Sequence, residues 1–281
     1  MKIGYHTAGL LLHDLPAAIL HLKQLGYGVI ALRPRKGAFD PESEVFHRQL
    51  EWIAEAIAET EMRVVLDLDA PYFHDPWKFD GPSLASPRTK ESSAALRWIS
   101  QWIELAAGFA DLITFCSGPA TTENAHKLSP EIALEHLAEQ LHQLLQQSAD
   151  RKVSLALRPR SGDAIASVAQ FERLQQWLAR DVSLGLAADI GEMLVGGELP
   201  VGDRLVRNLE HLRCVYLCQR QADHHADVPV GHGEVALTRI VSTLKQQDYD
   251  GATIVRVEGH SELGLQPAVE AIEIFADAGV R

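Results

Sequence analysis

The chain has 281 residues, of which 46% are hydrophobic, and this is enough to bury one large core. Its 38 acidic residues outnumber its 26 basic residues, which gives a formal net charge of −12. A surface this acidic disfavours a general role in binding nucleic acid or an anionic membrane, so we expect neither as a partner.

Short apolar runs alternate along the chain with amphipathic stretches whose apolar residues recur at helical spacing. The predicted strands are residues 3–6, 29–33, 63–67, 112–115, 153–157, 183–188, 214–217 and 253–256. The predicted helices are residues 14–25, 42–59, 91–108, 129–147, 167–178, 235–247 and 267–278, with a weaker helix over 201–209.

Eight strand–helix units in a chain of this length predict a single (β/α)8 TIM barrel. No linker or shift in composition divides residues 1–281, so we expect one domain. A doubly wound open sheet is the alternative, but it would usually carry a glycine-rich phosphate turn after its first strand, and residues 4–9 do not form one. The long irregular segment 69–86 follows the third strand, and we place it on the C-terminal face, where active sites of such barrels lie.

The three cysteines, Cys116, Cys214 and Cys218, are odd in number and lack the spacing of a disulfide framework or of a usual zinc site. This favours buried thiols in a reducing compartment. The N-terminus runs directly into a predicted strand, and the apolar residues 10–12 are too few for a signal core or a membrane span. We therefore expect a cytoplasmic protein.

Basic side chains gather where the predicted strands end. They are Arg33, Arg35, Lys36, Arg158, Arg160, Arg220 and Arg256. Arginine is the preferred residue for bidentate recognition of carboxylate or phosphate, so the pattern predicts an anion pocket at one end of the barrel. The alternative is internal pairing with acidic residues at the same strand ends, which would hold the barrel mouth together without a ligand. The carboxylates available for such pairing are Asp67, Asp189, Glu192 and Glu258.

Several motifs follow one another in a distinctive order. They are Gly4-Tyr5-His6-Thr7-Ala8-Gly9, Ala70-Pro71-Tyr72-Phe73-His74-Asp75-Pro76-Trp77-Lys78, Phe115-Cys116-Ser117-Gly118, Leu186-Ala187-Ala188-Asp189 and Pro229-Val230-Gly231-His232-Gly233-Glu234. Over nearly the whole chain, their order and spacing resemble the sugar phosphate isomerase/epimerase family with the xylose isomerase-like barrel. That resemblance implies a TIM barrel acting on sugar-like substrates.

In that family, Glu, Asp, His and Glu at the ends of strands five to eight typically hold one divalent ion. The matching residues in this chain are Arg158, Asp189, Tyr216 and Arg256. Two arginines and one aspartate carry a formal charge of +2 − 1 = +1, and guanidinium has no acceptor for a metal. Like charges about 4 Å apart repel by about 4 kcal/mol at an effective dielectric near 20, and a dication doubles this. We therefore expect no metal at this position and no other cofactor.

The alternative for the metal is a divalent cation, such as Mn or Zn, on displaced ligands, namely Asp189, Glu192 and His225. The candidate acid–base residues are His6, Asp189, Glu192 and His225, since imidazole and carboxylate groups transfer protons near working pH. The candidate substrate-binding residues are Arg33, Arg35, Tyr72, His74, Arg158, Arg160, Tyr216 and Arg256.

Three functions are consistent with these residues. The first is binding of a small phosphorylated or carboxylated polyhydroxy compound without the family's metal, with altered or lost isomerase activity. The second is a metal-dependent isomerase or epimerase that uses the displaced ligands. The third is a non-catalytic assembly partner. The expected partner is a small anionic or sugar-like molecule, and the sequence leaves a homo-oligomer open.

Overall fold

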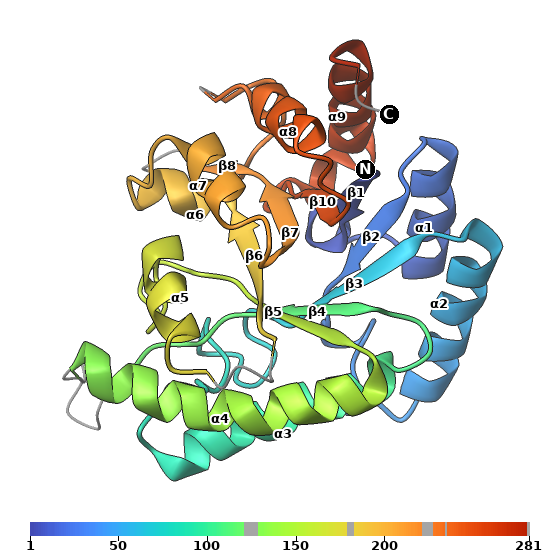
Figure 1. Ribbon diagram of the computed structural model, residues 1–281. Helices are drawn as coiled ribbons and strands as arrows, with labels where there is room; N and C mark the ends of the chain where they lie inside the picture. The colour runs from blue at the N-terminus through green and yellow to red at the C-terminus, as the bar shows by residue number, and fades with distance from the viewer. Residues whose placement is uncertain (121–128, 179–182, 221–226, 234, 280–281) are drawn as a thin grey trace.

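The structure is a computed structural model that describes residues 1–120, 129–178, 183–220, 227–233 and 235–279. Parallel strands close into a barrel in the order β1-β2-β3-β4-β5-β6-β7-β10, with β10 pairing back to β1 (Figure 1). The barrel strands are β1 Ile3–His6, β2 Val29–Leu32, β3 Arg63–Asp67, β4 Leu112–Phe115, β5 Ser154–Leu157, β6 Gly185–Asp189, β7 Leu212–Leu217 and β10 Ala252–Val255. The predicted (β/α)8 barrel is confirmed.

Helices surround the barrel, and α3 and α4 lie together along one side (Figure 1). They are α1 Leu15–Gln24, α2 Phe46–Thr60, α3 Thr89–Ala106, α4 Pro130–Arg151, α5 Val168–Gln175, α6 Ile190–Val195, α7 Val201–Arg207, α8 Leu237–Gln246 and α9 Gln266–Asp277. Side chains of Asp14, Ser129 and Ser167 accept backbone N–H groups at the starts of α1, α4 and α5. These caps explain why the predicted starts of the three helices lie within a residue of the observed ones.

Two departures from the prediction lie on the later part of the chain. The sixth strand is followed by two short helices, α6 and α7, and the sequence analysis predicted only the second. After β7, a small antiparallel hairpin forms from β8 (Gln219–Arg220) and β9 (Asp227–Val228). These elements are too short to show the periodicity on which the prediction relied. The 3-10 turns η1 (Thr7–Leu10) and η2 (Ser261–Leu263) follow the first and last barrel strands.

The residues inside the barrel alternate along each strand with residues that face the helices, as the period of two requires. Small side chains predominate within the barrel, where one inner cluster contains Val29, Ala31, Val65, Leu112, Ala156, Ala187, Cys214, Tyr216, Cys218, Ala252 and Ile254. At Gly4, a Cβ atom would lie 2.7 Å from the Val29 side chain, so the narrow interior excludes a larger residue there. Because these inner side chains are small, the barrel has room for long polar side chains at the C-terminal ends of its strands.

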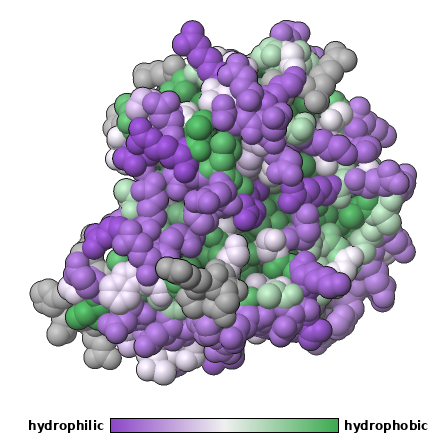
Figure 2. Space-filling view, viewed as in Figure 1, coloured by the Kyte–Doolittle hydropathy of each residue, from purple (hydrophilic) through white to green (hydrophobic). Residues whose placement is uncertain are grey.

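A second, much larger apolar cluster lies between the strands and the helices, and it includes Trp102, Phe171 and Phe275. Hydrophilic residues cover most of the face seen in Figure 2, and hydrophobic residues show mainly toward its middle. Within the described residues, no helix is long and apolar enough to cross a membrane.

Candidate functional site at the barrel mouth

One layer of polar side chains closes the C-terminal mouth of the barrel, because the inward-facing phase of each strand continues to its last residues. The layer contains His6, Arg33, Asp67, Arg158, Asp189, Tyr216 and Arg256, all of them buried. Arg158 and Arg256 are each only 1% exposed. The four residues that match the positions of the family's metal ligands, Arg158, Asp189, Tyr216 and Arg256, all belong to this layer.

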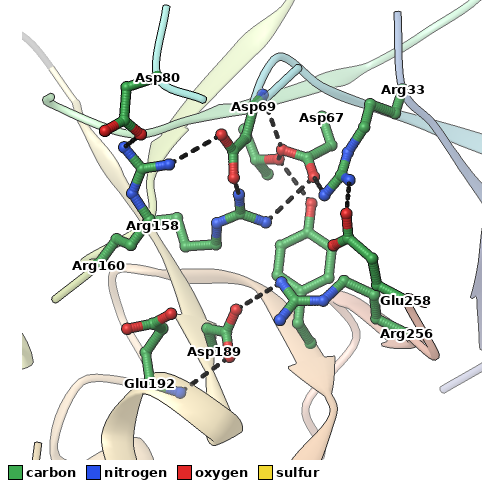
Figure 3. A network of polar contacts seen from close by, with 12 residues as sticks. Arg33, Asp67, Asp69, Asp80, Arg158, Arg160, Asp189, Glu192, Arg256 and Glu258 are labelled. Atoms are coloured by element: carbon green, nitrogen blue, oxygen red, sulfur yellow. Dashed lines mark hydrogen bonds and ion pairs between the residues drawn. The ribbon is translucent and has the colours of Figure 1, made fainter. Parts of the chain in front are cut away.

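Asp67 is the centre of the first of two charged groups, which we call the Asp67 cluster (Figure 3). Its Oδ2 atom lies 3.1 Å from Arg158 Nη1, 3.4 Å from Arg33 Nη2 and 2.9 Å from His6 Nε2. Burial alone would raise the pKa of the Asp67 carboxyl, but Arg158, His6 and Arg33 together hold this pKa well below its ordinary value. Asp67 is therefore a carboxylate at neutral pH.

The Asp67 cluster extends outward through alternating charges. Arg158 Nη2 also bonds Asp69, and Arg160 Nη1 donates to Asp69 Oδ1 at 3.0 Å. Arg160 then pairs with Asp80 at 2.8 Å and with Asp163 at 3.0 Å. The exposed fraction of the side chain rises along this path, from 0% at Asp67 to 18% at Asp69 and 47% at Asp80. One edge of the cluster therefore reaches solvent.

On its other side, the Asp67 cluster includes the pair of Arg33 and Glu258, with Arg33 Nη1 donating to Glu258 Oε1 at 2.7 Å. Burial raises the pKa of Glu258, but the nearby Arg33 and Arg256 outweigh this effect and lower the pKa to about 2. Arg33 Nε, in contrast, has no hydrogen-bond partner among the residues that the structure describes.

The second group, which we call the Asp189 cluster, consists of Asp189, Cys218, Asp227 and Arg256. Arg256 Nη1 lies 2.6 Å from Asp189 Oδ2, and Arg256 Nε lies 3.0 Å from Asp227 Oδ2. The thiol of Cys218 donates to Asp189 Oδ1 at 2.9 Å and accepts from Arg256 Nη2 at 3.3 Å. None of the four residues is more than 2% exposed. This cluster is closed to solvent.

Tyr216 separates the two clusters. The guanidinium carbon of Arg158 lies 5.1 Å from the ring centroid of Tyr216, and that of Arg256 lies 5.8 Å from it. The two hydroxyl oxygens of Tyr216 and Thr114 are hydrogen-bonded at 2.6 Å. Burial raises the pKa of Tyr216 well above its ordinary value, so the phenol stays neutral between two cations.

The candidate acid–base residues are held by contacts within the protein. His6 Nδ1 accepts the backbone N–H of Ala8 at 2.9 Å, which leaves Nε2 to donate to Asp67. Burial lowers the pKa of His6, so its ring is neutral. Glu192 lies in the first turn of α6 and accepts the backbone N–H of Ser161 at 2.9 Å. His225 lies outside the described residues.

Three candidate substrate-binding residues are not members of either cluster. Arg35 donates to the backbone carbonyls of Leu10 and His13 and so holds the loop after β1. Tyr72 is 53% exposed and packs edge-on against Phe79. His74 packs edge-on against Trp98, with ring centroids 4.6 Å apart.

A cavity of about 50 Å³ opens beside the outer edge of the Asp67 cluster. Its wall includes Asp69 and Arg160 from that cluster, together with His74, Trp98 and Cys116. Burial raises the pKa of the Cys116 thiol to about 12, which leaves it protonated and weakly nucleophilic. The space suits a single functional group of a ligand, and polar and aromatic side chains both face it.

A sequence profile of the xylose isomerase-like TIM barrel family matches residues 19–278. The chain belongs to this family. No curated protein sequence matches the chain. Among solved structures, the family member resembles a D-tagatose 3-epimerase-like protein, with a TM-score of 0.76, 16% identity and coverage of 99% of this chain and 97% of that one.

Two further solved structures have the same fold. A 3-keto-D-glucoside 4-epimerase from E. coli has a TM-score of 0.74 and 17% identity, with 99% of each chain covered. A xylose isomerase-like TIM barrel protein from Mycobacterium smegmatis, in complex with magnesium, has a TM-score of 0.67 and 16% identity, with 99% of this chain and 97% of that chain covered. At these identities the likeness establishes the fold alone.

The residues at the mouth do not fit the divalent metal that the family implies. Asp189 is the only acidic residue among the four matching positions, and its Oδ2 atom already faces the Arg256 guanidinium. The neutral phenol of Tyr216 and the two guanidinium groups supply no ligand. Within the described part of the chain, no three His, Cys, Asp or Glu side chains are arranged to hold a metal ion. The alternative metal ligands are Asp189, Glu192 and His225, and His225 lies outside the residues that the structure describes.

The sequence analysis missed several partners of the arginines. Asp69, Asp80 and Asp163 follow strand ends within loops, and Asp227 starts a two-residue strand. Cys218 was interpreted only as a buried thiol. One signal was available, because Asp67 and Asp69 are two residues apart and so continue the inward-facing phase beyond β3.

Proposed function

We propose that this family member binds a small polyhydroxy compound at the barrel mouth without a divalent metal, and that its isomerase activity is altered or lost. The observation that carries the proposal is the 2.6 Å contact between Arg256 Nη1 and Asp189 Oδ2. A permanently charged guanidinium group stands against the one carboxylate that matches the family's metal shell.

Paired charges at the rim suit hydroxyl groups, because a carboxylate accepts the hydroxyl proton and a guanidinium donates to the hydroxyl oxygen. Asp69 and Arg160 offer both functions at the small cavity, where Trp98 adds an aromatic wall. The solved neighbours include a D-psicose 3-epimerase in the presence of D-fructose and another with D-tagatose. These neighbours support a sugar-like compound as the ligand.

The ligand we propose also carries a phosphate or carboxylate group, which Arg160 would bind. Arg160 is 14% exposed, whereas Arg158 and Arg256 are almost completely buried. Arg160 is already shared among Asp69, Asp80 and Asp163. An anion would therefore share the guanidinium with carboxylates, and its binding should be modest and sensitive to salt.

The state of the candidate acid–base residues supports altered or lost turnover. Both ring nitrogens of His6 are used within the protein, and Asp189 bonds Arg256, Cys218 and the start of α6. To move a substrate proton, His6 would have to break one of these bonds. We therefore place ligand recognition, rather than proton transfer, at the centre of the proposed function.

Thermal unfolding with a ligand series tests this proposal. D-fructose, D-fructose 6-phosphate and inorganic phosphate are compared, each with and without EDTA. A bound ligand stabilises the folded protein in proportion to ln(1 + [L]/Kd), so we expect a dose-dependent rise in Tm that is largest for the sugar phosphate and unchanged by EDTA. Arg160→Gln should reduce the rise, whereas Arg63→Gln, on the opposite face, should not.

Other outcomes would identify the alternatives. A rise in Tm that requires added Mn²⁺ would point to the metal-dependent enzyme with displaced ligands. If no compound in the series, with or without Mn²⁺, changes Tm, the proposed binding function is wrong and a role as an assembly partner becomes the better hypothesis.

A further inference from the structure

The long segment between β3 and α3 is anchored near both of its ends. Near its start, Phe73 is only 3% exposed, and its ring centroid lies 4.8 Å from that of Trp98. Near its end, Ser83 is 1% exposed, and its hydroxyl group donates to the backbone carbonyl of Pro119 at 2.9 Å. These contacts fix the segment on either side of the residues between them.

The residues between the anchors, 74–80, form what we call the loop tip. It is mostly exposed to solvent, and Trp77 within it is 90% exposed. Within the described part of the chain, the salt bridge of Asp80 with Arg160 is the only ion pair or hydrogen bond that joins the loop tip to a residue outside segment 69–86. Asp80 is therefore the polar attachment of the loop tip to the barrel mouth.

Arg160 holds three carboxylates, and Asp80 is the one that is easiest to displace. Figure 3 shows the guanidinium group of Arg160 between Asp69 and Asp80. Asp69 is 18% exposed and also bonds Arg158, and Asp163 is 3% exposed. Asp80 is 47% exposed, so its carboxylate regains water when it leaves the guanidinium group, whereas the two more buried carboxylates would keep most of their desolvation cost.

We propose that Asp80 is a tethered competitor for the anion subsite at Arg160, and that the anionic group of the ligand is a phosphate monoester rather than a carboxylate. This inference rests on the proposed function and names its substrate class, which is a phosphorylated sugar-like compound. The phosphate takes the place of the Asp80 carboxylate at Arg160, so ligand binding releases the loop tip.

A tethered carboxylate discriminates between the two classes of ligand. Because the loop tip is fixed on both sides, Asp80 has an effective concentration on the order of millimolar at the guanidinium group. A free carboxylate has the same chemistry as Asp80, so it has to exceed roughly this concentration to replace it. A phosphate monoester carries a charge of about −1.5 to −2 at pH 7 and three acceptor oxygens, so it displaces Asp80 at a lower concentration.

The binding test compares Asp80→Asn with a matched control, Asp75→Asn. The control removes the same charge from the same loop tip, and its asparagine keeps an acceptor for the Trp77 backbone N–H, which Asp75 Oδ1 accepts at 2.9 Å. The probes are D-fructose 6-phosphate, the carboxylate D-gluconate and neutral D-fructose, and isothermal titration calorimetry measures their affinities.

We expect the wild type to bind D-fructose 6-phosphate about tenfold more tightly than D-gluconate, since the phosphate has the greater charge. Asp80→Asn should bind both anions about three- to fivefold more tightly than the wild type, which is the range of an exposed ion pair. The affinity for D-fructose should not change, because this compound does not compete for the guanidinium group. Asp75→Asn should bind all three probes as the wild type does.

Hydrogen exchange of residues 74–80 measures the attachment of the loop tip without any ligand. Its backbone amides should exchange faster in Asp80→Asn than in the wild type or in Asp75→Asn. D-fructose 6-phosphate should accelerate this exchange in the wild type and add nothing in Asp80→Asn, because the salt bridge is already absent from that variant.

The outcomes separate this inference from the proposed function. If D-fructose 6-phosphate binds the wild type but Asp80→Asn binds it no more tightly than Asp75→Asn does, or if exchange of the loop tip is the same in both variants, the competitor role of Asp80 is overturned and the proposed function stands. If D-gluconate binds the wild type as tightly as the phosphate, the choice of a phosphate monoester is wrong. If no probe binds any of the three proteins, the proposed function fails and this inference fails with it.

Discussion

The Asp67 cluster and the Asp189 cluster each place an arginine against the ring of Tyr216 and use the same chemistry with different access to solvent. In the Asp67 cluster, charges alternate from a buried centre to Asp80, which is 47% exposed. In the Asp189 cluster, every member is at least 98% buried. The difference indicates that the first cluster is suited to exchanging partners with a ligand, and that the second fixes the structure of the mouth.

This contrast follows from the dielectric environment. A buried carboxylate that loses its cationic partner keeps the full cost of its desolvation, whereas an exposed one regains water. The same arginine-to-carboxylate contact should therefore contribute very differently to stability in the two clusters. The predictions below test that difference, beginning with the largest effect.

Arg256→Met keeps most of the side-chain volume but removes the closest described cation from both Asp189 and Asp227. We expect a loss of about 3–5 kcal/mol in the free energy of unfolding, since one partner of a buried ion pair is removed. Arg160→Met should cost less, because its partners Asp69 and Asp80 are 18% and 47% exposed and regain water, while the buried Asp163 keeps its bond from the Gly118 backbone N–H. Urea unfolding of both variants measures the two values, and equal costs would remove the distinction between the clusters.

Acid should weaken the Asp67 cluster through Glu258. Its pKa falls from an ordinary value of 4.5 to about 2 in the folded protein, so its contribution to stability is complete above pH 4.5 and is lost as the pH falls toward 2. The shift corresponds to at most about 3 kcal/mol. The free energy of unfolding is measured from pH 6 to pH 2 in steps of about one pH unit. As the pH falls, this free energy should decrease less steeply in Glu258→Gln than in the wild type.

The control for this acid effect is Glu59→Gln, which changes an exposed glutamate on α2. Its pH profile should follow that of the wild type. A profile for Glu258→Gln that also follows the wild type would show that the pair with Arg33 does not contribute to the acid sensitivity of the mouth.

The smallest effect concerns the residue between the clusters. Tyr216→Phe removes the hydroxyl that bonds Thr114 but keeps the ring beneath the two guanidinium groups. We expect a cost of about 1 kcal/mol, the usual net value of one hydrogen bond. Tyr216→Ala also removes the ring and should lower the free energy of unfolding several times more. Chemical denaturation of both variants separates the contribution of the hydroxyl from that of the ring. Equal costs would mean that the ring adds no stability.

The sequence by itself determined the barrel and the contents of its mouth. Short apolar runs, alternating with helical patterns, predicted eight strand–helix units, and Arg158, Asp189 and Arg256 stand where three of those runs end. The loss of the family's acidic ligands was also readable, because guanidinium has no acceptor for a metal. These inferences depend only on local geometry and on the chemistry of single side chains.

Only the tertiary structure decided which charges meet. Arg256 reaches Asp227 and Cys218, and Arg160 reaches Asp69 and Asp163, through contacts that strand-end positions do not specify. Both the anion pocket and internal pairing were compatible with the sequence. In the folded chain four of the arginines are paired with carboxylates, namely Arg33, Arg158, Arg160 and Arg256. The reason is physical: long side chains choose among several opposite charges within reach, and that choice depends on loop positions and burial, which no local pattern encodes.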